Sequence, residues 1–535
     1  MSNLALSNGL DLNIMTQPST NLSFPSIGEA IKLLFDVSGL LPQKHNQSEC
    51  LPNEKDKKTL QTKLQRLSKE KGNLDNYFPE LAGTLGKLLI EATMSPSITG
   101  IALKTIEDLH VAYERTVSNE ATYSSKKENI KWILECWLPD LIIMSVRKYS
   151  LISCSNTEHI NLPQNSDWWL PTYGERVITP LERNWRWIYD QAKTSQYHFH
   201  NPSHCGGRAL QNLENASRWF RRGRIPTWSE LVSNIDTSTN LLANCEDERH
   251  QRSLTPEMIR GFKIVLFFAR ASTDIFNRVE SAYGPKFTKN LVHQINAQNR
   301  RSIKVHHSLQ KKVKAKLLVK GLSQSTQLTE QWASLAHDYL HCYREKLLQD
   351  AKFLEQSELM GAEVDPTFTD IKKLIRRCEP FLISQAFRQK KYTPNSEQIS
   401  YSAMYIEGMD LMRRKEFSEI QLETYRNRVA EKSLTEELQW LIEWLIATQF
   451  LRGGDYSCAF PHYKRAFDLS KYKIGAEIYS LVNDYAEACA KAAKPKEFKT
   501  LIRWASFNNV KVRWCSNSKM SDDAISSAYE MFKKC

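Results

Sequence analysis

The stretch GDYSCAFPHYKRA, residues Gly454 to Ala466, decides the fold of this 535-residue chain. It opens with a tight-turn sequence, Gly454-Asp455-Tyr456, and continues with Ala459, Tyr463 and Ala466. Residues at these spacings share one side of a helix, and small and aromatic side chains there let the helix cross the one before it. The stretch therefore predicts a pair of helices joined by a tight turn.

The same turn recurs on both sides of this stretch. It is written Lys415-Glu416-Phe417 upstream and Lys496-Glu497-Phe498 downstream. The apolar or small residues that accompany these two turns are Gly408, Leu411 and Ile420, then Leu501 and Ala505. One helical hairpin cannot bury its own apolar face, so three successive hairpins are expected to share a core and leave a concave surface.

These motifs resemble the tetratricopeptide repeat, over residues 400–509. Ala447 and Phe450 stand where the first helix of that family packs. The turns are 39 and 42 residues apart, longer than the 34-residue repeat of the family, which implies longer helices or a divergent array. The resemblance implies that residues 400–509 dock a protein partner; the alternative is that these helices only cap the domain before them.

The rest of the chain also reads as helix. Leu60, Leu64 and Leu67 recur at helical spacing, and Thr255-Pro256-Glu257 is a helix start, with an N-cap Thr and Pro at the first position. That helix is expected to run toward Val279. Turn-formers are few, with 19 Gly and 19 Pro, and no alternation of period two stands out. We expect a predominantly all-α, multi-domain protein.

Chain length, turn signals and changes of composition divide the chain into five parts, since about 150 residues make an ordinary domain. The expected parts are a flexible tail at 1–25, a helical domain at 26–165, a Trp- and Arg-rich module at 166–250, a helical domain at 251–395 that contains a basic window, and the repeats at 400–535. Further helices are expected after Thr329 and over Thr369 to Gln389.

Composition limits the cellular setting. The eleven Cys are dispersed and form no Cys-x-x-Cys pair, which favours a reducing compartment. The N-terminal segment has no basic cluster followed by an apolar run, and no apolar run reaches eighteen residues. We expect a cytoplasmic protein with no membrane partner and no cofactor.

The basic window, residues 281–329, holds ten Lys and Arg and three His but no Asp or Glu, against a net charge of +13 for the whole chain. Such an excess favours an anionic partner, and a phosphate backbone is the first candidate. An acidic protein, a membrane surface or a solvated basic face are the alternatives. The candidate contacts are Lys286, Lys289, Arg300, Arg301, Lys304, Lys311, Lys312, Lys314, Lys316 and Lys320. Leu309, Val313 and Leu317 mark one apolar helical face between them.

A second basic zone interleaves Arg with Trp219 and Phe220. Its candidate contacts are Arg208, Arg218, Arg221, Arg222 and Arg224. Ser217-Arg218-Trp219, with Gly223, Pro226 and Leu231, resembles the end of a helix-turn-helix of the lambda-repressor type over residues 216–231, although Gly comes one place late. Arg would bind phosphates while the aromatics stack on bases or pack inward. In the alternative reading Trp219 is a core residue and the Arg are solvated. We expect the two zones to form one surface.

Two further patterns are candidate sites for metal or catalysis. His198, His200, His204 and Cys205 offer up to four zinc ligands, but they come from one segment without a distant second pair, so no metal is expected. Arg301 and His306 have the Arg-x4-His spacing of HEPN-type ribonucleases, which they resemble. The chain has no phosphate-binding loop, dinucleotide fingerprint or nucleophile elbow.

The leading hypothesis is therefore a non-catalytic nucleic-acid-binding protein, with DNA favoured over RNA, that docks a protein through its C-terminal repeats as part of a larger assembly. The alternative is a regulatory scaffold that binds an acidic partner. A helical ribonuclease that uses Arg301 and His306 ranks third.

Overall fold

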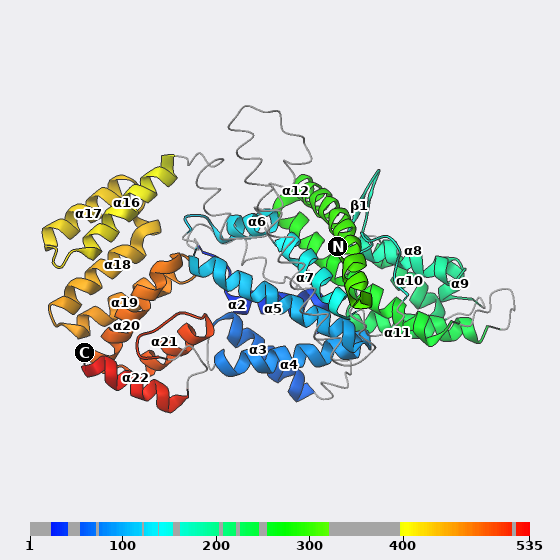
Figure 1. Cartoon of the computed structure of the whole chain (residues 1–535), viewed down its shortest axis with the longest axis horizontal. Helices are drawn as coiled ribbons and strands as arrows, with labels where there is room; N and C mark the ends of the chain where they lie inside the picture. Colours follow the sequence, from blue (N-terminus) through cyan, green and yellow to red (C-terminus); the bar gives the residue numbers. More distant parts are fainter. Residues whose placement is uncertain are drawn as a thin grey trace, which may run out of the picture.

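The computed structural model describes residues 23–40, 54–70, 74–119, 122–136, 138–153, 161–202, 207–220, 225–245, 254–319, 396–515 and 521–534. In these residues the fold is predominantly α-helical, as expected (Figure 1). The strands described are β1 (Thr172–Tyr173) and β2 (Val177–Ile178), an antiparallel pair in which Thr172 lies opposite Ile178. This short hairpin lies within residues 166–250, the part expected to form a Trp- and Arg-rich module.

The helices fall into three groups along the chain. The N-terminal group is α2 (Ile27–Ser38), α3 (Glu54–Ser68), α4 (Leu74–Thr93), α5 (Pro96–Asn119), α6 (Lys126–Cys136) and α7 (Leu138–Ser153). The middle group is α8 (Pro180–Gln191), α9 (Gln196–His200), α10 (Arg208–Phe220), α11 (Trp228–Ala243) and α12 (Pro256–Val319). The C-terminal group is α16 (Ser396–Arg413), α17 (Glu419–Glu431), α18 (Thr435–Arg452), α19 (Tyr456–Ser470), η1 (Gly475–Glu477), α20 (Ile478–Lys491), α21 (Pro495–Phe507) and α22 (Asp522–Lys534).

Local sequence explains several of these boundaries. Leu60, Leu64 and Leu67 are all buried along α3, as their spacing predicts. The expected start of α12 is also confirmed: Thr255 Oγ1 accepts a hydrogen bond from the Met258 N–H at 3.3 Å, and Pro256 is the first residue of the helix. The expected end near Val279 falls a few residues before Gly284, which breaks the helix; a second helical segment then continues α12 to Val319.

The C-terminal helices form successive pairs, α16 with α17, α18 with α19, and α20 with α21, followed by α22 (Figure 1). Ala459, Tyr463 and Ala466 are fully buried on α19, which packs most extensively on α18. Gly408 marks a close approach in the first pair, since a Cβ there would lie 2.6 Å from both Leu441 Cδ2 and the Tyr425 hydroxyl. The likeness to tetratricopeptide repeats stays a prediction.

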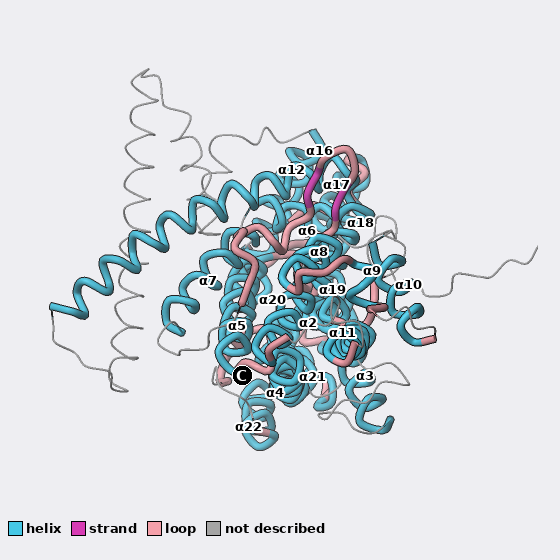
Figure 2. The backbone as a smooth tube through the Cα atoms, turned by 90° about the vertical axis from the view of Figure 1, so that its right-hand side faces the viewer, coloured by secondary structure: helices cyan, strands magenta, loops and turns pink. Residues whose placement is uncertain are grey.

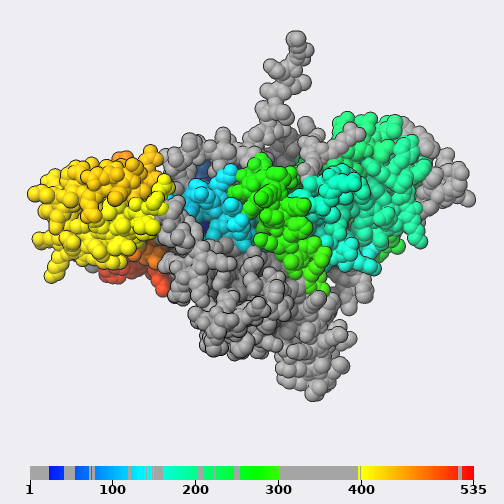
Figure 3. Space-filling view, turned by 90° about the horizontal axis from the view of Figure 1, so that it is seen from above, coloured from blue at the N-terminus to red at the C-terminus, as the bar shows by residue number. Residues whose placement is uncertain are grey.

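The buried apolar residues form three clusters. The largest runs from α2–α5 without interruption into the C-terminal helices, so both ends of the chain share one core. The second surrounds Trp185 and Trp219 and joins α8–α11 to the first part of α12. The third joins α7 and Leu170 to α12 on both sides of its break. Figure 3 shows the C-terminal pairs at one end of the molecule, α8–α11 at the other and α12 between them.

Polar contacts fasten the N-terminal helices to the connection between α19 and α20. The carboxylate of Glu70 accepts hydrogen bonds from Trp504 Nε1 at 3.0 Å and from the Tyr472 hydroxyl, and it pairs with Lys471 Nζ at 2.8 Å. The backbone N–H of Phe24 donates to the Tyr472 carbonyl at 2.8 Å. We call this region the terminal junction.

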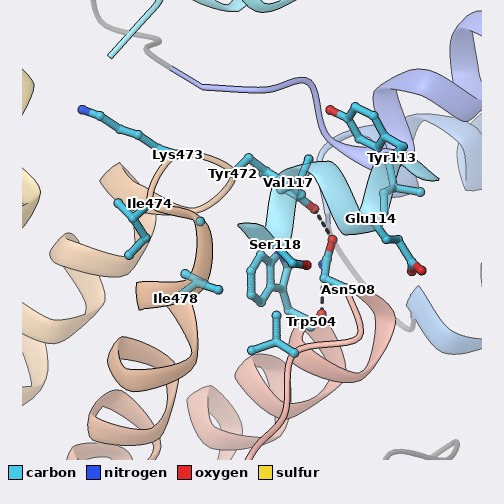
Figure 4. A pocket seen from close by; sticks show the side chains of 13 residues that line it. Tyr113, Glu114, Val117, Ser118, Tyr472, Lys473, Ile474, Ile478, Trp504 and Asn508 are labelled. Carbon is cyan, nitrogen blue, oxygen red and sulfur yellow. Dashed lines mark hydrogen bonds between the residues drawn. The ribbon is translucent and has the colours of Figure 1, made fainter. Parts of the chain in front are cut away.

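A narrow pocket lies at the terminal junction (Figure 4). Tyr113 and Val117 of α5 form one wall, and Trp504 and Asn508 of the α21 region form another. The Tyr472 hydroxyl donates to Asn508 Oδ1 at 2.8 Å across it. Side chains from the N-terminal and the C-terminal helices thus line this pocket together.

Candidate nucleic-acid interface

Helix α12 is built from two helical segments that differ in burial. Its first segment is a core element, with Phe262, Val265 and Ala269 fully buried. Gly284 then breaks the helix with φ 83° and ψ 165°, a backbone conformation that a side chain would strain. The second segment runs from Pro285 to Val319 and is about 50 Å long. Figure 2 shows its far end projecting from the body of the molecule. The break therefore changes α12 from a core helix into a surface helix.

The base of the projecting segment is firmly packed. Leu291, Val292 and Ile295 are buried against Ile143 of α7 and against Leu170. Two hydrogen bonds continue this attachment: Asn299 Oδ1 accepts from Arg147 Nη2 at 3.1 Å, and Asn299 Nδ2 donates to the Ser166 carbonyl at 2.6 Å. Because this face is packed, the opposite face of the segment, from Lys286 to Arg300, is held toward solvent.

Five exposed cations gather along this face and on the neighbouring helix α6. They are Lys127 and Lys131 of α6 with Lys286, Lys289 and Arg300 of α12, and we call them the α6–α12 basic surface. Within the described part of the chain, no carboxylate forms an ion pair with any of the five. An array of unpaired cations on two packed helices offers several phosphate contacts in a fixed arrangement.

Two half-buried rings lie between the two helices. Lys127 Nζ is 5.8 Å from the ring centroid of Tyr283, and Lys131 Nζ is 5.4 Å from that of Phe287. The two rings are 5.1 Å apart, and the Tyr283 hydroxyl donates to the Lys127 carbonyl at 2.8 Å. Burial raises the pKa of Tyr283 to about 12, so the phenol is neutral near pH 7. The rings support the lysine side chains by cation–π attraction.

The two glutamates of α6 neutralise little of the positive charge of this surface. Glu128 turns back to the start of the helix, where its carboxylate accepts from the Ser125 N–H at 2.9 Å and from the Ser125 hydroxyl at 3.0 Å. Glu135 is exposed one turn beyond Lys131 and is the acid that an approaching polyanion would meet. The charge of the surface is therefore positive.

Of the residues expected from the basic window, Lys286, Lys289 and Arg300 belong to this surface. The backbone of α12 also carries Arg301, Lys304, Lys311, Lys312, Lys314 and Lys316, together with His306, but their side chains lie outside the described part of the chain, as does Lys320 altogether. The structure therefore does not place the Arg301 and His306 side chains relative to one another. Lys127 and Lys131 were not expected; the Lys126-Lys127 doublet was their only signal in the sequence.

The second basic zone has a different environment. Trp219 is buried, with its ring stacked 6.4 Å from that of Trp185, so it is a core residue and does not face nucleic acid. Arg218 is exposed and pairs with Glu214 at 3.3 Å. Arg221, Arg222, Arg224 and the side chain of Arg208 lie outside the described residues.

Helix α10 and the far end of α12 lie at opposite edges of the view in Figure 2. Most side chains of the two basic zones lie outside the described residues, so the expectation that the zones form one surface stays a prediction. The helix-turn-helix resemblance fails in one detail, since Pro226 does not open α11. Thr227 is the N-cap of α11, where its hydroxyl accepts from the Glu230 N–H, and the Pro226 carbonyl instead accepts from Arg270 Nε.

The candidate metal ligands do not converge. His200 is buried, with Nε2 2.9 Å from the Tyr189 hydroxyl and Nδ1 2.8 Å from the Ser238 hydroxyl. Burial lowers its pKa to about 3. Both ring nitrogens are thus used inside the core, His198 lies half-buried on α9, and His204 and Cys205 are outside the described residues. No group of three or more His, Cys, Asp or Glu with metal-binding geometry occurs among the residues described.

Comparison with family models, curated proteins and solved structures finds no match to this chain. None of the described helices is long and apolar enough to cross a membrane.

Proposed function

We propose that this protein binds nucleic acid, duplex DNA in preference to RNA, through the α6–α12 basic surface and without catalysing a reaction on it. The observation that carries the proposal is the set of five exposed cations on two packed helices, none of which forms an ion pair with a carboxylate among the described residues. Lysines act as point charges, so they position the backbone without reading sequence. Binding should therefore depend strongly on salt and weakly on base sequence.

The C-terminal helices supply the second part of the proposal, which is that residues 400–509 dock a protein partner within a larger, cytoplasmic nucleic-acid-acting assembly. The end of the array formed by α16 and α17 supports it. Ile399, Ile406 and Ile420 are 57%, 57% and 79% exposed there. Stacked helical repeats normally end in a polar outer face, so an apolar end favours a partner.

The test is a fourfold charge reversal, Lys127→Glu, Lys131→Glu, Lys286→Glu and Lys289→Glu. If each lysine contacts one phosphate, the variant should flatten the slope of log K against log salt by about 3.6 and weaken duplex binding roughly 10³-fold at 0.1 M salt. Fluorescence anisotropy of a labelled 20-base-pair duplex, titrated at several salt concentrations, measures both quantities.

The matched control reverses four exposed lysines of the C-terminal region, namely Lys415, Lys432, Lys496 and Lys511. It makes the same change in net charge but should retain most of the affinity and the salt slope. If both fourfold variants lose affinity equally, the α6–α12 basic surface is not the binding site. Tighter binding to poly-glutamate than to DNA by the unmodified protein would favour the acidic-partner alternative.

A further inference from the structure

A second basic surface lies on α3 and α4. Lys55, Lys58, Lys63 and Arg66 line an open groove with Tyr77 of α4, and Thr59 and Thr62 complete it. Figure 1 places α3 and α4 along the lower edge of the molecule, away from α6. The side chains of the groove come from one face of α3, because the opposite face, with Leu60, Leu64 and Leu67, is buried. We call this set the α3–α4 groove.

The arginine of this groove is held in place by its neighbour. Arg66 Nη1 donates to the Tyr77 hydroxyl at 3.3 Å, which leaves the other N–H groups of the guanidinium for an anion. The phenol acts as the acceptor in this bond, so its own proton is available to donate. Both groups are therefore oriented to bind one phosphate together.

The threonines contribute shape rather than donors. Thr59 Oγ1 donates to the Lys55 carbonyl at 2.8 Å, and Thr62 Oγ1 donates to the Lys58 carbonyl at 2.7 Å. Their protons are committed to the helix, so attraction for an anion must come from the cations and Tyr77. Small side chains at these two positions keep the floor of the groove low between the longer lysines.

One acid competes for the groove. Lys63 Nζ forms an ion pair with Glu80, whose side chain is 51% exposed. Lys55, Lys58 and Arg66 have no such partner among the described residues. Among the residues that the structure describes, the groove thus presents three cations without an ion-pair partner and a fourth that an anion could gain by displacing Glu80.

We propose that the α3–α4 groove binds single-stranded nucleic acid, with Lys55, Lys58 and Arg66 on successive phosphates and the ring of Tyr77 stacked on a base. The cations extend over about 16 Å of helix, since each residue adds about 1.5 Å, which matches a strand of a few nucleotides. A cationic groove that ends at a half-exposed aromatic ring is the usual arrangement for sequence-tolerant single-strand binding. This inference goes beyond the proposed function and uses none of the residues of the α6–α12 basic surface.

The test neutralises the groove with Lys55→Gln, Lys58→Gln and Arg66→Gln in the full chain. Each contact to a single strand contributes about 0.7 to the salt slope, so the triple variant should lose about 2 from the slope and bind roughly 100-fold more weakly at 0.1 M salt. The probe is a fluorescein-labelled oligo-dT of 20 nucleotides, compared with the 20-base-pair duplex. Duplex affinity should change much less than oligo-dT affinity.

A second variant tests the role of Glu80. Glu80→Gln removes the competing carboxylate and frees Lys63, so oligo-dT should bind about fivefold more tightly, with a steeper salt slope. A residue with a merely structural role would not give a gain. Thermal unfolding of both variants checks that the fold is retained, which we expect because the altered side chains lie at the surface.

The outcomes separate this inference from the proposed function. Selective loss of oligo-dT binding in the triple variant, with a gain in Glu80→Gln, supports the groove as a single-strand site. If the triple variant binds oligo-dT unchanged, the groove is not a single-strand site. The proposed function is still supported in that case if the α6–α12 charge reversal loses oligo-dT binding. An equal loss of duplex and oligo-dT affinity in the triple variant also contradicts a single-strand site in the groove. Tighter binding of a poly-glutamate peptide than of oligo-dT would contradict it as well.

Discussion

Gly39 should tolerate no side chain, and replacing it with alanine measures how tightly α2, α11 and α12 are joined. Gly39 ends α2 in the left-handed conformation, with φ 68°, and the guanidinium of Arg270 passes directly over it. A Cβ at this position would lie 2.3 Å from Arg270 Cζ, where no atom fits. Arg270 Nε donates to the Pro226 carbonyl at 2.7 Å, and Nη1 donates to the Val37 carbonyl. Arg270 therefore bonds two separate helix ends, and an added methyl group must push it away from them.

The size of the effect follows from these contacts. Alanine in the left-handed region costs about 1 kcal/mol. Loss of one or both buried hydrogen bonds from the charged guanidinium adds about 2 kcal/mol each. We expect Gly39→Ala to lower the free energy of unfolding by about 3 to 5 kcal/mol, measured by urea denaturation followed by circular dichroism.

Gly454 provides the matched control, because it has φ 78° and an added Cβ would meet nothing within 4 Å. Gly454→Ala should therefore cost only about 1 kcal/mol. In an Arg270→Ala background, Gly39→Ala should also cost only about 1 kcal/mol, since the obstruction is gone. A cost of Gly39→Ala no larger than that of Gly454→Ala, or a full cost that persists without Arg270, would refute the obstruction by Arg270.

Two further predictions concern buried polar groups. Burial lowers the pKa of His200 to about 3, whereas the unfolded chain takes up this proton near pH 6.5, so stability should fall by about 1.4 kcal/mol per pH unit as the pH drops from about 6.5 toward 3. Urea unfolding of His200→Gln at pH 7 and pH 5 should show a smaller difference between the two pH values than the unmodified protein; an equal difference would contradict this. Glu70→Ala removes the acceptor of Trp504 Nε1 and should cost about 2 to 3 kcal/mol. It should also speed amide hydrogen exchange at Phe24, which is bonded to Tyr472, and an unchanged exchange rate there would show that Glu70 does not hold the terminal junction.

Local signals in the sequence predicted helix starts and the predominantly helical fold. Thr255-Pro256 opens α12 because an N-cap and a proline act within one turn, without help from distant residues. The end of the same helix was predicted too early. Gly284-Pro285 interrupts the helix, yet Pro285 also starts a new segment with a suitable φ, so α12 resumes instead of ending.

The sequence predicted the part of the candidate site that lies on α12 but not the part on α6, because the two helices meet only through tertiary packing. Lys286 and Lys289 stand out in an acid-free window, but Lys127 and Lys131 lie far earlier in the chain and join them only through the packing of α6 on α12. His200 shows the opposite case. Its neighbours in sequence suggest a ligand cluster, whereas Tyr189 and Ser238, from two other helices, occupy both of its ring nitrogens.

The two sides of the terminal junction are synthesised at different times. Trp504, which donates to Glu70, follows it by 434 residues. At roughly 5 to 20 residues per second, a ribosome needs roughly 20 to 90 s to supply that partner. During this interval the nascent N-terminal helices carry apolar faces whose cover has not yet been synthesised, so a truncated transcript would yield a product that chaperones and proteases recognise as unfinished.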